Sequence, residues 1–332
     1  MDSYPTPAGF AQFTATDAVE LSQQTDEWNF EFSQLTRGVL KVEGSLLALD
    51  GVSLAHMRLN QTVLQRGYGP PSMVAVFMPR EGSAPVFARG QSVERGQCAT
   101  IAGAELEAVT HVGYEETDLA INLDACRVQL DALNGGSLGV NFGTTIAAPG
   151  PEWIADMTAR VQWLLSAARE HGVDFMSPQR RLSLSDHLLA VMVRFNPAPA
   201  DVDSNTRRAT ATRRVAIRLA REYIHAHLYE PLPLSELCRR SGLKVRTLET
   251  GFREVTGLTP VAYVRSLRLN AVRRTLHDAS ARHQSISEIA LDSGFWHLSQ
   301  FATDYRKLFG ETPTSTRSRS SMADSPGAAH AH

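Results

Sequence analysis

The feature that most constrains how this chain can fold is an internal repeat in its last third. The segment Leu234–Pro260 recurs as Ile286–Pro313. Matched residues lie 52 positions apart in the first half of the repeat and 53 apart in the second, because one residue is inserted between Gly294 and Phe301. They are Ser235, Glu236, Ser241 and Gly242 with Ser287, Glu288, Ser293 and Gly294, and then Gly257, Thr259 and Pro260 with Gly310, Thr312 and Pro313. Two copies of so short a motif predict one structural unit used twice.

Each copy has the pattern of a helix, a tight turn and a second helix. Ser285 and Glu288 fit a capping box, which opens a helix at about Ser287. Gly242 and Gly294 are placed to supply the positive φ that a sharp turn between helices requires. In the second helix of each copy, apolar residues recur on one face and should form the core: Leu248, Phe252 and Val255, and Phe301, Tyr305 and Leu308.

The opposite faces of these second helices should be exposed, and they carry polar side chains suited to base edges in a major groove. The predicted DNA-binding residues are Lys244, Arg246, Thr247, Glu249, Thr250 and Arg253 in the first copy, and His297, Leu298, Ser299, Gln300, Thr303 and Arg306 in the second. A helix over Val261–His277 should join the copies rigidly. If both second helices point the same way, they meet successive major grooves about 34 Å apart. The joining helix carries Arg265, Arg268, Arg273 and Arg274, of which Arg273 is a candidate phosphate contact.

Charge is distributed unevenly along the chain. Residues 205–320 contain 20 Lys and Arg against 10 Asp and Glu, whereas the rest of the chain contains 13 basic and 25 acidic residues. A basic third beside an acidic two-thirds predicts that one domain binds a polyanion. The alternative is a plain helical bundle whose basic residues are only solvated, and the repeated turn motif argues against it. Double-stranded DNA is therefore the predicted partner.

The segment Leu234–Arg317 resembles the DNA-binding domain of the AraC/XylS family of bacterial transcription regulators. The most specific residues are in the second copy: Ile289-Ala290, Gly294-Phe295, Phe301, Tyr305-Arg306-Lys307, Gly310 and Pro313. The resemblance implies base or backbone contacts from Arg246, Glu249 and Thr250, and from His297, Leu298, Ser299 and Thr303. The sequence departs from the family pattern at Val272, where Ala is usual, and at Thr314–Arg317, where the family has an aromatic–Arg pair.

The region from Trp28 to Asp124 has the pattern of a β domain. Short apolar runs such as Ser45–Leu49, Met73–Phe77 and Leu119–Leu123 are separated by Gly and Pro, which suggests a barrel or a sandwich. The family resemblance implies a cupin-like domain that senses a small molecule and mediates dimerisation. Two helices should follow, one with an apolar stripe (Ile154, Met157, Val161, Leu164 and Ala168) and one over Leu184–Arg194. Either could pack on the β domain or form a dimer seam.

These patterns predict an α+β protein with two domains. Residues 1–196 form a β-rich domain with helices after about residue 125, 197–212 a linker, 213–317 the double helix-turn-helix domain, and 318–332 a disordered tail. No secretory signal or membrane-spanning run is visible, and three scattered cysteines give no disulfide framework. We therefore expect a cytoplasmic protein without a membrane partner.

The predicted function is sequence-specific transcription regulation, as an activator that responds to a small molecule. A ligand-independent regulator controlled by partner proteins is the alternative, and the sequence does not separate the two. A metal-dependent cupin-like enzyme fused to a DNA-binding domain is a third hypothesis. It is disfavoured because His56 and His111 are isolated and His225 and His227 should face apart on a helix. We expect no enzyme activity, no metal and no cofactor; expected partners are DNA, RNA polymerase, a small effector and a second copy of the chain.

Overall fold

The computed structural model describes residues 8–323 except 26–27, 50, 104, 123, 125–144 and 195–203. Its N-terminal part contains two antiparallel sheets. The seven-stranded sheet has the order β1 (Gly9–Ala15), β3 (Val42–Leu49), β4 (Val52–Leu59), β11 (Glu115–Asn122), β6 (Met73–Pro79), β9 (Cys98–Ala102) and β12 (Thr145–Ala147). The five-stranded sheet has the order β2 (Phe30–Gln34), β5 (Val63–Tyr68), β10 (Glu105–Thr110), β7 (Val86–Ala88) and β8 (Gln91–Ser92).

The sheets enclose an apolar core that includes Phe32, Ile101 and Tyr114. The predicted α+β class is confirmed, and of the two β architectures expected from the sequence the structure has two separate sheets, not a closed barrel. The three predicted strands lie in β3, β6 and β11, although Leu123 is outside the described residues. Strand β1 and helix α1 (Ala18–Gln24) precede the predicted β region and were not anticipated from the sequence.

Two helices cover the outer face of the seven-stranded sheet, α3 (Pro151–His171) and α4 (Pro178–Arg194), joined by a 3-10 turn over Val173–Phe175. All five residues of the α3 stripe are buried and pack with Leu47, Leu54 and Leu119 of the sheet. The expectation that this stripe could be a dimer seam is therefore wrong. The physical reason is that the sheet presents an apolar outer face, and α3 is the element that removes that face from water.

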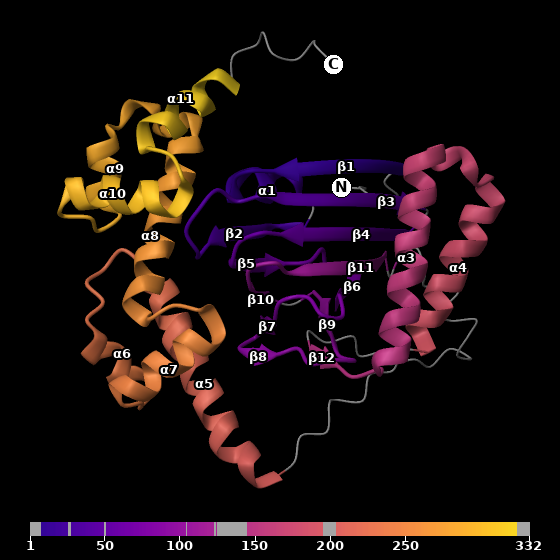
Figure 1. The fold of residues 1–332 in the computed structure, drawn as a ribbon, viewed down its shortest axis with the longest axis horizontal. Helices are drawn as coiled ribbons and strands as arrows, with labels where there is room; N and C mark the ends of the chain where they lie inside the picture. Colours follow the sequence, from indigo (N-terminus) through magenta and orange to yellow (C-terminus); the bar gives the residue numbers. More distant parts are fainter. Residues whose placement is uncertain are drawn as a thin grey trace.

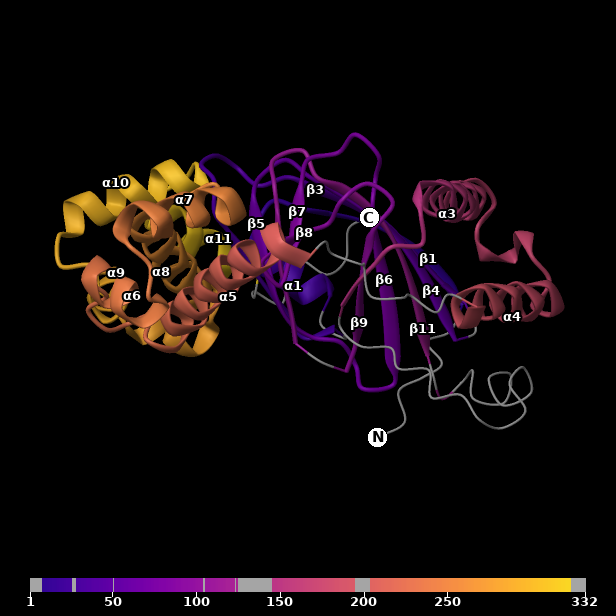
Figure 2. The same ribbon diagram turned by 90° about the horizontal axis from the view of Figure 1, so that it is seen from below.

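The C-terminal part is helical and lies against the opposite side of the sandwich from α3 and α4 (Figures 1 and 2). It comprises α5 (Ser204–Ala226), α6 (Leu234–Ser241), α7 (Val245–Thr256), α8 (Pro260–His277), a 3-10 segment (Ala279–His283), α9 (Ile286–Asp292), α10 (Leu298–Phe309) and α11 (Pro313–Ala323). Within the described residues, no helix has the length and apolar character needed to cross a membrane.

Two predicted boundaries differ from the structure. The linker was expected over 197–212, but α5 begins at Ser204, because no Gly or Pro interrupts the chain from there to Ala226. The tail was expected to be disordered from residue 318, but α11 continues to Ala323. Its residues Thr316 and Ser320 are buried, and the Ser320 hydroxyl donates to the His277 carbonyl of α8, so tertiary contacts extend this helix.

Candidate nucleic-acid interface

The first helix-turn-helix unit consists of α6 and α7. Gly242 follows α6 with a left-handed φ of 68°, as the turn prediction required. Helix α7 has Lys244 at its N-cap position. Its residues Leu248 and Phe252 are fully buried among apolar side chains of α5 and α8. The predicted core face of this unit is confirmed.

The second unit consists of α9 and α10. The capping box is present: the Ser285 hydroxyl accepts from the backbone N–H of Glu288, whose carboxylate accepts from the N–H of Ser285. Gly294 has a φ of 81°, which confirms the turn prediction. Phe301 and Tyr305 are buried on α10, as expected, together with Leu308.

The repeated Gly-x-Thr-Pro motif sets where the second helix of each unit ends and the next helix starts. We call these second helices, α7 and α10, the recognition helices. Gly257 and Gly310 end α7 and α10 in the left-handed conformation, with φ values of 72° and 77°. The hydroxyls of Thr259 and Thr312 then accept hydrogen bonds from the first turns of α8 and α11. Both recognition helices are twelve residues long as a result.

The two recognition helices lie along the same side of the helical region (Figure 2). Ten of the twelve predicted DNA-binding residues are exposed, and Thr247 and Glu249 are partly buried. The structure therefore gathers them into two sets, one on each recognition helix. The role of each of these residues in DNA binding stays a prediction.

Several of these side chains already have partners within their own helix. Glu249 pairs with Arg253 at 3.6 Å, and the Gln300 amide donates to Asp304 at 2.9 Å. Arg246 and Arg306 are exposed, and their guanidinium groups make no hydrogen bond or ion pair with the described residues. These two guanidinium groups are the ones that can bind an acceptor without first breaking a contact.

Sequence reasoning missed two exposed apolar side chains at this surface. Val245 begins α7 and is 47% exposed; it is the counterpart of Leu298, which begins α10 and was predicted. The 53-residue offset of the repeat is the signal that could have found it. Trp296, in the turn before α10, is 77% exposed. An apolar group here can contact a thymine methyl.

Three of the four arginines of α8 have structural roles. Arg268 donates to the backbone carbonyls of Leu228 and Glu230, 2.8 and 2.6 Å away, and so ties α8 to the segment before α6. Arg274 pairs with Glu31 of the N-terminal domain at 3.1 Å. Arg273 is only 3% exposed, so the prediction that it contacts phosphate is wrong.

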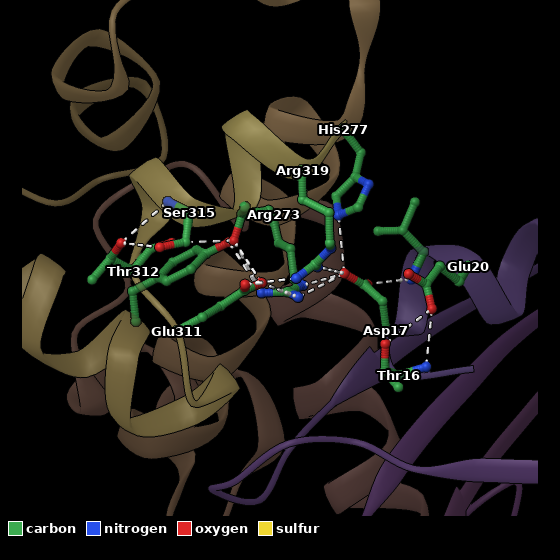
Figure 3. A network of polar contacts seen from close by, with 12 residues as sticks. Thr16, Asp17, Glu20, Arg273, His277, Glu311, Thr312, Ser315 and Arg319 are labelled. Carbon is green, nitrogen blue, oxygen red and sulfur yellow. Dashed lines mark hydrogen bonds and ion pairs between the residues drawn. The ribbon is translucent and has the colours of Figure 1, made fainter. Parts of the chain in front are cut away.

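Arg273 is instead the centre of a buried ion-pair cluster between the domains (Figure 3). Its guanidinium lies 2.6 Å from Asp17 and 2.7 Å from Glu311, and His277 also binds Asp17 at 2.9 Å. Burial alone would raise the pKa of Asp17, but the hydrogen bond from His277 and the charge of Arg273 outweigh it and hold this pKa well below its usual range. Asp17 also accepts from the N–H of Val19 at the start of α1. We call Asp17, Arg273, His277 and Glu311 the Asp17 cluster.

The N-terminal domain also contacts the C-terminal end of each recognition helix. In α10, the Leu308 carbonyl accepts from the Gly38 N–H at 3.0 Å and from the Gln34 side-chain amide at 2.8 Å. In α7, the Val255 carbonyl lies 3.2 Å from Nε2 of His111. Desolvation lowers the pKa of His111, so the imidazole is neutral at neutral pH and donates from Nε2. The two carbonyls are thus satisfied across the domain boundary.

Among the residues that the structure describes, no group of three or more His, Cys, Asp or Glu is placed to hold a metal ion. His225 contacts the Tyr263 hydroxyl, whereas His227 contacts Glu230. The two side chains therefore contact different parts of the chain.

The comparisons with known proteins match the helical region. A helix-turn-helix domain family matches residues 237–319. The XylDLEGF operon transcriptional activator of Pseudomonas putida is 40% identical over 95 residues, which are 29% of this chain and 30% of the relative. This region is an AraC/XylS-type helix-turn-helix domain.

Two further proteins are similar to this AraC/XylS-type domain. The probable thc operon regulatory protein of Rhodococcus erythropolis is 35% identical over 98 residues, 30% of each chain. A crystal structure of a probable AraC family transcriptional regulator from Rhodopseudomonas palustris has 33% identity and a TM-score of 0.30, covering 32% of this chain and 97% of that one. The alignments with the operon regulators span about 30% of each relative's length.

Proposed function

We propose that this protein is a transcription regulator that binds double-stranded DNA through α7 and α10, which enter successive major grooves. The observation that carries the proposal is the pair of equally long recognition helices with exposed polar faces on one side of the molecule. Helices presented in this way fit the docking geometry of helix-turn-helix proteins, and the positive balance of residues 205–320 supports attraction to phosphate.

The direct test is selection of binding sites from a random duplex pool with the full-length protein, followed by footprinting. We expect two protected segments about one helical turn apart, each recognised in a major groove. Recovery of no preferred sequence, together with binding that does not weaken as salt rises, would contradict the proposal.

We further propose that the protein is an activator that works with RNA polymerase in the cytoplasm, since the relatives with matching domains include a named operon activator.

The β domain is proposed to sense a small molecule and to mediate homodimerisation. What supports its regulatory role is that it contacts the C-terminal ends of both recognition helices through Leu308 and Val255. A ligand-independent regulator, controlled by partner proteins, is the second candidate. Thermal-shift screening of the full-length protein against small metabolites, repeated with its DNA site, separates the two.

A further inference from the structure

A groove of about 540 Å³ lies between α10 and the turn that follows α7, at the boundary of the domains. Its walls come from three parts of the chain: the loop after β2, the turn and first half of α8, and the C-terminal half of α10. Arg37 lines it from the N-terminal domain, Arg265 from α8 and Lys307 from α10. The groove is thus completed by a residue that no helix-turn-helix unit contains.

The charge of this groove is positive. Asp304 is its one acidic lining residue, and both of its carboxylate oxygens are engaged, by Arg265 at 3.0 Å and by the Gln300 amide at 2.9 Å. Arg37 and Lys307 are exposed and make no hydrogen bond or ion pair with the described part of the chain. Two uncompensated cations therefore face a shared, open-sided groove, and an anion satisfies them better than water alone.

The position of the groove identifies the anion. Two recognition helices that occupy successive major grooves leave a stretch of backbone between them, and its phosphates face the protein surface that joins the helices. Here that surface is the exposed face of α8, from Val261 to Arg265, flanked by Lys307 of α10. We propose that Arg37, Arg265 and Lys307 bind the DNA phosphates between the two major grooves, so that the N-terminal domain supplies one of the backbone contacts. This inference rests on the proposed function.

The loop that carries Arg37 is held in place before any DNA arrives. On one side of Arg37, the Thr36 hydroxyl donates to the Gln61 side chain at 2.7 Å. On the other, the Gly38 N–H donates to the Leu308 carbonyl of α10 at 3.0 Å. Because the backbone on both sides of Arg37 is fixed, only its side chain has to be ordered on binding, which lowers the entropic cost of the contact.

The test compares full-length Arg37→Ala, Arg37→Lys and Arg160→Ala on a duplex selected with the wild-type protein. Arg160 is the matched control, since it is exposed and lies on α3, on the far side of the sandwich from the helical region. The affinity is measured as a function of salt, and ethylation interference maps which phosphates are contacted. One lost phosphate contact reduces the slope of log affinity against log salt by about 0.9. Between about 50 and 200 mM salt, the fold-loss of affinity of Arg37→Ala should therefore be about 3.5 times smaller than that of the wild type.

We expect Arg37→Ala to weaken selected and random duplexes equally and to lose interference at a phosphate between the two major-groove segments. Arg37→Lys should keep the wild-type slope, and Arg160→Ala should be indistinguishable from the wild type. A wild-type slope and interference pattern in Arg37→Ala would overturn the inference while leaving the proposed function intact. If the wild-type protein selected no duplex at all, the proposed function itself would fail.

Discussion

Replacing Arg273 by alanine tests whether the Asp17 cluster or a DNA phosphate is the true partner of this arginine. The guanidinium is 3% exposed and lies 2.6 Å from Asp17, which is itself 1% exposed. Removing one member of a buried ion pair leaves the other without compensation and costs about 3–5 kcal/mol. His277 and Arg319 remain 2.9 and 3.4 Å from Asp17 and retain part of the interaction, so we expect a loss of about 3 kcal/mol.

The measurement is urea unfolding of the full-length protein, combined with the salt dependence of DNA binding. Arg274→Ala is the matched control, because Arg274 is the next residue of α8 but its ion pair with Glu31 is partly exposed. Exposed pairs contribute about 0–1 kcal/mol, so the control should unfold close to the wild type. For Arg273→Ala we expect lower stability and an unchanged salt slope. Wild-type stability with a slope reduced by about 0.9 would show that Arg273 binds phosphate and would refute this reasoning.

The same variant should change the response to acid. The pKa of Asp17 is lowered in the folded protein, so its contribution to stability is present above the unfolded value of about 3.9 and is lost as the pH falls through the folded pKa. Without Arg273 the folded pKa of Asp17 rises toward the unfolded value. The acid unfolding transition of Arg273→Ala should therefore move to higher pH, as followed by circular dichroism; an unmoved transition would contradict the assigned pairing.

Three further predictions concern the repeat and the core. Gly294→Val places a β-branched residue at a φ of 81°, which costs more than about 1 kcal/mol. Footprinting of this variant should show only the half of the site that the first unit protects, and an intact footprint would count against the turn assignment. Arg246→Ala should reduce discrimination at one or two base pairs by about 1–3 kcal/mol in a site-selection experiment, and an equal loss on random DNA would contradict a base contact. Met157→Asp with Val161→Asp should unfold the N-terminal domain, because both residues are buried. The control variant Trp163→Asp, on the exposed side of the same helix, should stay folded. Circular dichroism and light scattering measure both, and a folded Met157→Asp, Val161→Asp variant would mean that the α3 stripe is not part of the core.

Most of the helix-turn-helix architecture could be predicted because its determinants are local. The turn at Gly242, the capping box at Ser285 and the buried face around Phe301 each depend on residues within one or two helical turns, and each is confirmed. Strands such as β6 could also be predicted, from short apolar runs between Gly and Pro. The repeat offset also predicts the equivalence of Val245 and Leu298, which lie 53 positions apart.

The domain interface could not be predicted, because its partners are far apart in the sequence. Asp17 and Arg273 are separated by 256 positions, and neither has a local pattern that marks it as an ion pair. An arginine on an amphipathic helix next to DNA-reading units is more simply interpreted as a phosphate contact, and that interpretation failed here. The α3 stripe was ambiguous for a related reason: periodicity shows that Met157 and Val161 share a face, but not which surface covers that face.

The interface has a consequence for how the β domain could control DNA reading. The N-terminal domain holds Leu308 at the C-terminal end of α10 and Val255 at that of α7, whereas the predicted base contacts cluster nearer the N-terminal ends. A twelve-residue helix is about 18 Å long and moves as a rigid rod, so a displacement of its C-terminal end also displaces its N-terminal end. Two rods joined by α8 and both held by one domain keep a fixed relative orientation. The β2–β3 loop holds α10 through Gly38 and the turn between β10 and β11 holds α7 through His111, so both ends of this joined pair are fixed to the same domain.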